Sequence, residues 1–333
     1  MFSTSLLEKY FRKTLSYLKT IEKEHGIAKL IITVPELNET LSSNIYRALE
    51  QLKIEKDRVI VKSHAASAMY YALSQSKDLW MNDVGIFHYV GQKLLYYHIG
   101  IHRKTKPCAV TIQREDFSNS FGILTEEEGV QNELSYLFLN LAKRVLARHV
   151  ISTVYITGTG FEGNWINGTL QELCLGRRVF KGQNLYTKGA CYMARELVGE
   201  KKLGDYILLS EEMLQTAVWI SAYIDAKNQE LMLAKVGTPW FEIKESVEFI
   251  FEDEPEITIY TKSIFGKEIN SYKLALEQLD KRPNRTTRAE LSVICKEPGY
   301  LEVIIRDLGF GELIPATHCQ SSMLIPLSNE MVI

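Results

Sequence analysis

The amino-acid sequence predicts an α/β domain followed by a separate β-rich domain. In about the first two-thirds of the chain, short aliphatic runs alternate with stretches whose apolar residues recur at helical spacing. Further along, the pattern changes to successive strand-like segments. With 333 residues and 46% apolar content, the chain is long enough to bury two cores. We therefore expect domains at residues 1–204 and 205–333.

The α/β part begins with helices and strands in alternation. Residues 5–24 carry apolar side chains at helical spacing between charged ones, which predicts an amphipathic helix that stops before Gly26. Residues 29–35 are mostly aliphatic or β-branched, as in a strand that helices cover on both faces. The same criteria then predict a helix at residues 41–52, a strand at 59–61 and an Ala-rich helix at 65–73.

Residues 82–114 interrupt this alternation with three β-rich stretches. Turn signals at residues 91–92 and 104–107 separate the stretches, which predicts a β-meander. Thr125 and the three glutamates after it form a capping-box pattern, so we expect a long helix from there to about Arg148 and no metal site at these acids. Next come a strand at 153–157, a turn at 158–160 and helices at 166–174 and 188–196.

The β-rich part is expected to consist of strands around one clear hairpin. In each of two strands, three apolar residues spaced two apart share the inward face, and residues 297–299 form the turn between them. The inward residues are Leu291, Val293 and Cys295, then Leu301, Val303 and Ile305. We also expect strands at 218–225, 246–252 and 257–262, a short helix at 274–279 and a solvated basic loop at 281–285.

Composition and charge exclude several classes of function. The 39 Lys and Arg residues are interspersed with 41 Asp and Glu, so no basic surface is expected for nucleic acid or an anionic membrane. No apolar run approaches the roughly 18 to 20 residues of a membrane helix, and the N-terminus lacks a secretory signal pattern. We therefore expect a soluble cytoplasmic protein. The five cysteines are odd in number and lack a Cys-x-x-Cys pair, which predicts free, mostly buried thiols.

Four segments of the α/β part, taken in order, point to a known family. Residues 154–161 form a strand and a turn that contains Gly158, Thr159 and Gly160, and a Gly-Ala pair follows at 189–190. The other three segments are residues 31–35, which end in Thr-Val-Pro, residues 63–68, and residues 83–89, which begin with Asp83 and include Gly85. Together they resemble the nucleotide-binding domain of the seventy-kilodalton heat-shock chaperones, which share an actin-like fold of ribonuclease-H type.

The resemblance implies a cleft for ATP or ADP with Mg²⁺. Its candidate residues are Asp83, Gly85, Gly158, Thr159 and Gly160. The resemblance extends more loosely to the β-rich part, where residues 288–307 are similar to paired strands of the chaperones' sandwich-like substrate domain. A protein or peptide partner and a homo- or hetero-oligomer are therefore expected, as is membership of a bacterial family of unknown function.

Departures from the family's pattern argue against ATP hydrolysis. The family's first phosphate hairpin would precede the opening helix, so the α/β domain is expected to be incomplete at its N-terminus. The family's catalytic glutamate aligns with Ser63, and Ile86 and Phe87 replace glycines whose amides cradle phosphate. We therefore predict a pseudo-ATPase without catalytic residues, a degenerate chaperone-like scaffold or protein-binding protein. The alternative is an ATP-binding chaperone-type ATPase completed by a missing N-terminal segment or a partner chain.

Two histidine patterns have a functional and a structural interpretation. His98 and His102 are four residues apart in a β-rich stretch, and without a third ligand they are interpreted as structural histidines, so no metal is predicted. Ser63 and His64 resemble a nucleophile and its base. Because no strand-to-helix elbow presents the serine, a hydrolase is not favoured.

Overall fold

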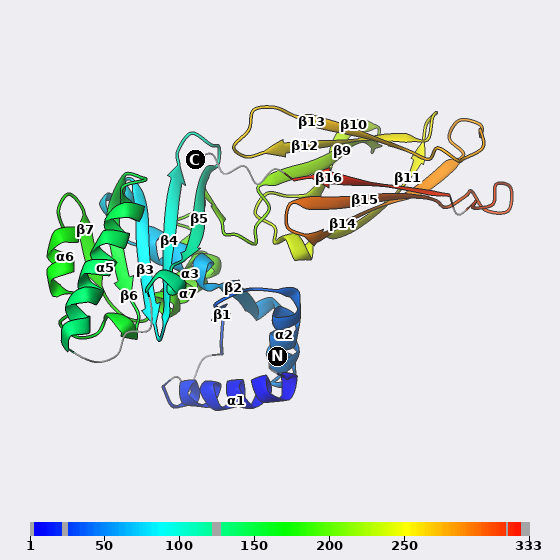
Figure 1. The fold of residues 1–333 in the computed structure, drawn as a ribbon. Coiled ribbons are helices and arrows are strands. Elements are labelled where there is room, and N and C mark those ends of the chain that lie inside the picture. Colours follow the sequence, from blue (N-terminus) through cyan, green and yellow to red (C-terminus); the bar gives the residue numbers. More distant parts are fainter. Residues whose placement is uncertain (1–2, 22–25, 122–127, 318, 328–333) are drawn as a thin grey trace. The chain divides into compact units, whose positions relative to one another are not determined.

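The computed structural model describes residues 3–21, 26–121, 128–317 and 319–327, and it divides into two compact units (Figure 1). Unit 1 is Met1–Glu211 and unit 2 is Glu212–Ile333. Helices and strands alternate in unit 1, whereas the described part of unit 2 consists of strands and a single 3-10 turn. The expected class, α/β followed by a β-rich region, is confirmed. The capping box expected at Thr125 lies outside the described residues.

Unit 1 opens with a small layer of two helices on two strands. Helices α1 (Thr4–Ile21) and α2 (Glu39–Gln51) accompany the parallel pair β1 (Leu30–Val34) and β2 (Val59–Ser63). The amide of Leu41 donates to the side chain of Asn38, which caps α2. The shared core of this layer contains Phe11, Val34, Ile45, Ala48, Leu49, Val59 and Val61.

A six-stranded sheet forms the centre of unit 1, in the order β7-β6-β3-β4-β5-β8. The expected meander is confirmed as three antiparallel strands, and β6 lies parallel to β3 on its other side. Strands β7 and β8 continue the sheet at its two edges, each parallel to its neighbour. The bounds are β3 (Asp83–Val90), β4 (Lys93–His102), β5 (Cys108–Asp116), β6 (Ile151–Thr157), β7 (Arg178–Lys181) and β8 (Tyr206–Leu209).

Helices cover both faces of this sheet (Figure 1). Successive residues of β3 and β4 point to opposite faces, so Phe87 and Tyr96 pack with α5 and α6, while Ile86 and Tyr97 pack with α3 and α7. The bounds are α3 (His64–Leu73), α4 (Ser118–Phe121), α5 (Glu128–Leu146), α6 (Asn167–Leu173) and α7 (Leu185–Arg195). Helices α3 and α7 touch closely, because a Cβ atom at Gly189 would stand 1.8 Å from the carbonyl oxygen of Ser67.

The units divide a few residues later than the sequence suggested. Residues 206–209 form β8, which pairs with β5 and therefore belongs to the sheet of unit 1. The sequence pattern assigned them to the β-rich domain, since a short apolar strand carries no mark of the sheet that it joins.

Unit 2 is a sandwich of two four-stranded sheets around one core. Their orders are β10-β9-β12-β13 and β11-β14-β15-β16. The expected hairpin is confirmed, with Leu291 opposite Ile305 and Val293 opposite Val303 in the register of β14 and β15. The bounds are β9 (Thr216–Ile224), β10 (Lys227–Ala234), β11 (Lys244–Phe251), β12 (Glu256–Ser263), β13 (Asn270–Ala275), β14 (Thr287–Glu297), β15 (Tyr300–Asp307) and β16 (Gln320–Pro326).

Three expectations for local structure were wrong. No helix forms at residues 274–279, where β13 ends with Leu274 buried and Leu276 follows it into the core. The basic loop at 281–285 is not wholly solvated, because the Arg282 side chain is only 8% exposed and donates two hydrogen bonds to the carboxylate of Asp307. The five cysteines are free, but only Cys295 is buried.

None of the described helices is long and apolar enough to cross a membrane.

Candidate functional site

The residues proposed for a nucleotide cleft lie at opposite ends of one strand pair. In the parallel register of β3 and β6, Asp83 stands beside Ile151 and His88 beside Thr157. Asp83 and Gly85 are therefore at the start of β3, whereas Gly158, Thr159 and Gly160 follow the end of β6. At roughly 3.3 Å per residue, the two groups are about 17 Å apart along the strands. The structure does not bring these five residues together.

The glycine-rich turn at the carboxyl end is packed against the protein's own backbone and side chains. Gly158 has a φ of +110°, and a Cβ atom there would stand 2.2 Å from the carbonyl oxygen of Tyr89. A Cβ atom at Gly160 would stand 2.2 Å from the ring of Tyr89. That ring packs edge-on against Phe121 and Phe161. Both glycines are thus required for the close approach of β3 to this turn.

Beside this turn lies a cluster that the sequence did not indicate, formed by His64, His88 and Tyr186. His64 begins α3, His88 is near the end of β3, and Tyr186 is in the first turn of α7. The ring of His64 stacks on Tyr186 with 4.2 Å between centroids, and His88 Nδ1 is hydrogen-bonded to the Tyr186 hydroxyl. These contacts bring together three elements that are far apart in the sequence.

Burial keeps this cluster uncharged at neutral pH. Burial, together with the nearby His88, lowers the pKa of His64 to about 4, and burial also lowers the pKa of His88. Burial raises the pKa of the Tyr186 hydroxyl. A phosphate group would need donors or cations at this end of the sheet, and the two imidazoles supply no positive charge there.

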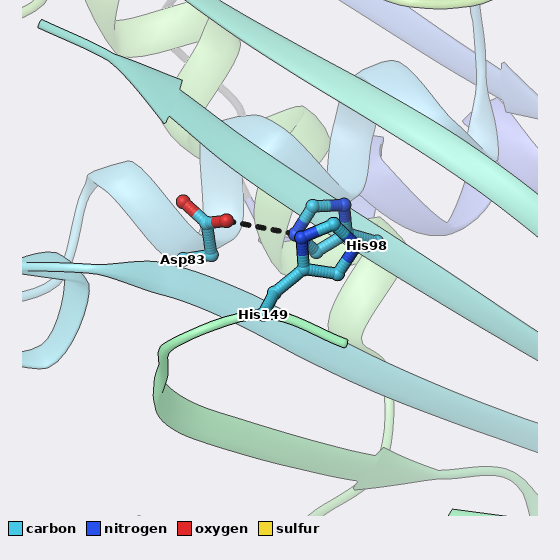
Figure 2. Close-up of side chains that lie close together, drawn as sticks. All are labelled: Asp83, His98 and His149. Carbon is cyan, nitrogen blue, oxygen red and sulfur yellow. Dashed lines mark hydrogen bonds and ion pairs between the residues drawn. The ribbon is translucent and has the colours of Figure 1, made fainter. Parts of the chain in front are cut away.

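At the amino end of β3, three side chains converge, as Figure 2 shows. Asp83 Oδ2 and His98 Nε2 are 2.9 Å apart, and the rings of His98 and His149 stack with 3.8 Å between centroids. The carboxylate, imidazole and imidazole atoms that could bind a metal all lie within 4.8 Å of one another. We name these three residues the Asp-His-His group.

The fold positions each member of this group from a different element. Asp83 begins β3, and the antiparallel register places His98 of β4 opposite Gly85. His149 lies between the end of α5 and the start of β6, next to the strand that pairs with β3. A Cβ atom at Gly85 would come within 3.1 Å of Leu146 and 3.2 Å of Tyr96, so this glycine makes room for core side chains.

Electrostatics favours a carboxylate and a neutral imidazole in this group. Burial by itself would raise the pKa of Asp83, but hydrogen bonds from His98 and from the amide of Ile101 outweigh it, so that pKa is lowered. Burial, followed by the charge on His98, lowers the pKa of His149. The His98 side chain is 10% exposed and that of Asp83 24% exposed, so solvent reaches one side of the group.

The sequence singled out His98 but paired it with a different histidine. His102 Nε2 lies 2.9 Å from the hydroxyl oxygen of Thr111, and His102 is not a member of the Asp-His-His group. Asp83 and His149, rather than His102, are the residues grouped with His98. The sequence assigned Asp83 to the candidate nucleotide cleft. It did not indicate His149, because the spacing of this residue from His98 follows no motif.

Comparison with known proteins gives families but no activity. No curated protein matches the sequence. A model described as a domain of unknown function (DUF8552) matches residues 213–326, which lie within unit 2. A model described as the C-terminal part of a family of unknown function (DUF5716) matches residues 2–211, which is more than half of the chain and coincides with unit 1. The chain therefore belongs to this family of unknown function, DUF5716.

Proposed function

We propose that the chain is a non-hydrolysing relative of the actin-like ATPases, closest to the seventy-kilodalton chaperones, and that unit 2 binds an extended peptide segment of a partner protein. One observation carries the binding role. A groove of about 820 Å³ lies on the side of the sandwich where β10 and β11 form the edges of their sheets. Its volume is within the range of pockets that hold small ligands or a few side chains.

The groove offers both backbone and side-chain interactions to an extended segment. Among the described residues, β10 and β11 are each paired with a strand on one side only, so their outer N–H and C=O groups are available to another strand. Leu231, Val247 and Phe249 supply an apolar lining. An added strand would place alternate side chains against this lining.

The charges at the groove favour an uncharged or weakly charged segment. Glu248 forms an ion pair with Arg288, and both line the groove. Glu252 pairs with Arg285, and Glu256 pairs with Lys273. Since each of these acids has a basic neighbour, the rim provides little net charge to attract a strongly basic or acidic peptide.

The sheet of unit 1 supports the relationship to the actin-like fold. Three antiparallel strands, β3 to β5, are extended beyond β3 by the parallel strands β6 and β7, with helices in the connections. A ribonuclease-H-type fold combines a meander and parallel strands in this way. The sheet also has helices packed on each of its two faces, which agrees with that architecture.

The carboxyl end of the same sheet supports the loss of hydrolysis. Tyr89 occupies the space above Gly158 and Gly160, where the resemblance places adenosine. The neighbouring His64 is uncharged at neutral pH. Phosphoryl transfer requires charge stabilisation and a coordinated metal, and a neutral, tightly packed cluster supplies neither.

Peptide binding by the full chain tests the proposal. We expect saturable binding of fluorescein-labelled peptides with alternating apolar residues, measured by fluorescence anisotropy. Phe249→Arg should weaken this binding at least about 10-fold, because it places a charged chain in the groove. Leu324→Arg is the matched control, since Leu324 is exposed on β16, a different edge strand. Equal binding by both variants, or none by the natural chain, would refute the groove as the binding site.

The alternative proposal is a chaperone-type ATPase completed by an N-terminal segment or a partner chain. The name of the matched family model, which describes a C-terminal part, favours testing it. We expect no saturable heat when the chain is titrated with ATP and Mg²⁺. Binding of ATP by the chain alone, or ATP hydrolysis after addition of the family's N-terminal part, would favour the alternative.

A further inference from the structure

We propose that Asp83, His98 and His149 bind a divalent transition-metal ion, best matched by Zn²⁺. This inference is independent of peptide or nucleotide binding and concerns the opposite end of the sheet from the glycine-rich turn. It is carried by the convergence of three side chains from three elements, drawn in Figure 2. Neither family description assigns a metal to this chain.

The donor atoms are those that zinc prefers in proteins. Two imidazole nitrogens and one carboxylate oxygen bind Zn²⁺ at about 2.0–2.2 Å, and three protein ligands leave a fourth position for water. In a tetrahedral site, ligand atoms at these distances are roughly 3.3 Å apart. In the Asp-His-His group they lie within 4.8 Å, and Asp83 Oδ2 is 2.9 Å from His98 Nε2. The His98 and His149 rings stack with 3.8 Å between centroids, so they would have to tilt toward one another to bind a common ion.

The surroundings hold the carboxylate in a suitable orientation. The amide of Ile101 donates to Asp83 Oδ1 over 3.0 Å, while Oδ2 faces His98. Outer hydrogen bonds of this kind fix a ligating carboxylate and raise metal affinity. One oxygen is thus anchored by the backbone of β4, and the other faces the point where a metal would bind.

The cationic side chain that precedes His149 in the sequence does not oppose a metal ion at this place. Arg148 precedes His149, but its guanidinium donates to both carboxylate oxygens of Glu115, at 2.8 and 3.0 Å. Its charge is therefore compensated by a direct partner. Asp83 contributes a negative charge next to the two imidazoles, so a divalent ion would be attracted to the group.

A bound ion would join the α5–β6 connection to the β3–β4 hairpin. His149 precedes β6, whereas Asp83 and His98 belong to the hairpin. A ligand that binds the folded state and not the unfolded one stabilises the fold. The proposal therefore predicts that zinc raises the melting temperature of unit 1, in addition to binding with one ion per chain.

The test uses the full, untagged chain, because a histidine tag would itself bind zinc. After removal of metals with a chelator, we expect calorimetry to show one saturable Zn²⁺ per chain. Replacement of zinc by Co²⁺ should give visible absorption bands typical of a four- or five-coordinate ion. His98→Gln and Asp83→Asn should each weaken zinc binding by at least about 100-fold, more than the loss of an outer partner costs.

Two further variants separate loss of a ligand from loss of the fold. His149→Ala changes a residue in a connection rather than in a strand, so the metal-free variant should fold and still lose the zinc-dependent rise in melting temperature. His102→Gln is the matched control, since this nearby histidine is outside the group, and it should bind zinc within about 3-fold of the natural chain. Absence of saturable zinc binding in the natural chain, or unchanged binding in His149→Ala and His98→Gln, would overturn the proposal.

Discussion

The two ends of the β3–β6 strand pair differ in chemistry although they belong to the same sheet. The carboxyl end carries neutral, stacked side chains such as His64 and Tyr186. Tyr89 occupies the space beside the glycines of the turn. The amino end carries a charged carboxylate, Asp83, and two imidazoles, and the possible ligand atoms of the three side chains lie within 4.8 Å of one another. A glycine-rich turn can thus serve packing, while Asp83, His98 and His149 at the other end of the sheet bring together side chains of the kind that could bind a metal. The following predictions test this difference, starting with the largest expected effect.

Gly158→Ala should strongly destabilise unit 1. The new Cβ atom would meet the Tyr89 carbonyl oxygen at 2.2 Å, and the φ of +110° is unfavourable for alanine. We expect the free energy of unfolding to fall by about 3–5 kcal/mol, measured by urea unfolding. Gly91→Ala is the control, because Gly91 has a φ of +60° but open space around it, and should cost about 1 kcal/mol. Equal losses in the two variants would show that the turn is not closely packed.

Tyr186→Phe tests the hydrogen bond at the carboxyl end. The variant keeps the stacking on His64 but removes the hydroxyl that is hydrogen-bonded to His88 and also interacts with the Tyr97 hydroxyl. Leaving a buried polar group without its partner should lower the free energy of unfolding by about 1–2 kcal/mol. Tyr136→Phe, at an exposed position of α5, is the control and should change it little. A similar loss in both would mean that the hydrogen bond contributes nothing measurable.

Asp83→Asn tests the amino end without added metal. The amide can still accept from the backbone of Ile101, but the charge-assisted hydrogen bond to His98 is lost. We expect a decrease of about 1 kcal/mol in the free energy of unfolding. We expect zinc to raise the melting temperatures of the natural chain and of Tyr186→Phe equally, and to leave that of Asp83→Asn unchanged. A zinc response in Asp83→Asn would contradict the separation of the two ends.

A pH dependence at the carboxyl end should have an effect of about the same size as Asp83→Asn. The pKa of His64 is about 4 in the folded chain and 6.5 for the free side chain, so the unfolded chain binds the proton first as pH falls. Stability from this group is complete above pH 6.5 and is lost between 6.5 and about 4. The neighbouring His88 acts in the same direction, since burial lowers its pKa as well.

Urea midpoints at pH 7.5 and 5.0 measure this loss. Because the ring is partly exposed, we expect His64 to account for about 1 kcal/mol of the decrease in the free energy of unfolding between pH 7.5 and pH 5.0. His64→Gln should show a correspondingly smaller decrease in stability over the same pH range. An equal or larger decrease in the variant would mean that His64 is not held neutral in the folded chain.

Regular patterns made much of the fold predictable. The meander of β3 to β5 was visible because its turns fall at residues 91–92 and at 104–107. The hairpin of β14 and β15 was visible because alternate apolar residues fill one face. Strand β10 was missed, since it is an edge strand whose first four residues are polar and exposed. Polar edges carry little of the alternation on which a strand prediction depends.

The candidate site was less predictable because it depends on register. That Asp83 meets His98 follows from the antiparallel pairing of β3 with β4, and the position of His149 follows from the parallel pairing with β6. Neither register can be read from local spacing. Asp83 and Gly85 match the family's phosphate-binding hairpin in sequence. In the structure, the turn of the β3–β4 hairpin is at residues 91–92, at the opposite end of β3 from Asp83.

The pairing of β8 with β5 has a practical consequence for shortened versions of the chain. A version of unit 1 that ends at residue 204 would lack Tyr206–Leu209 and leave the outer edge of β5 open along residues 108–111. Open edges are templates for intermolecular strand addition, so such a version should form soluble aggregates during purification. Extending it to Glu211 would restore the last strand of the sheet and favour a monodisperse preparation.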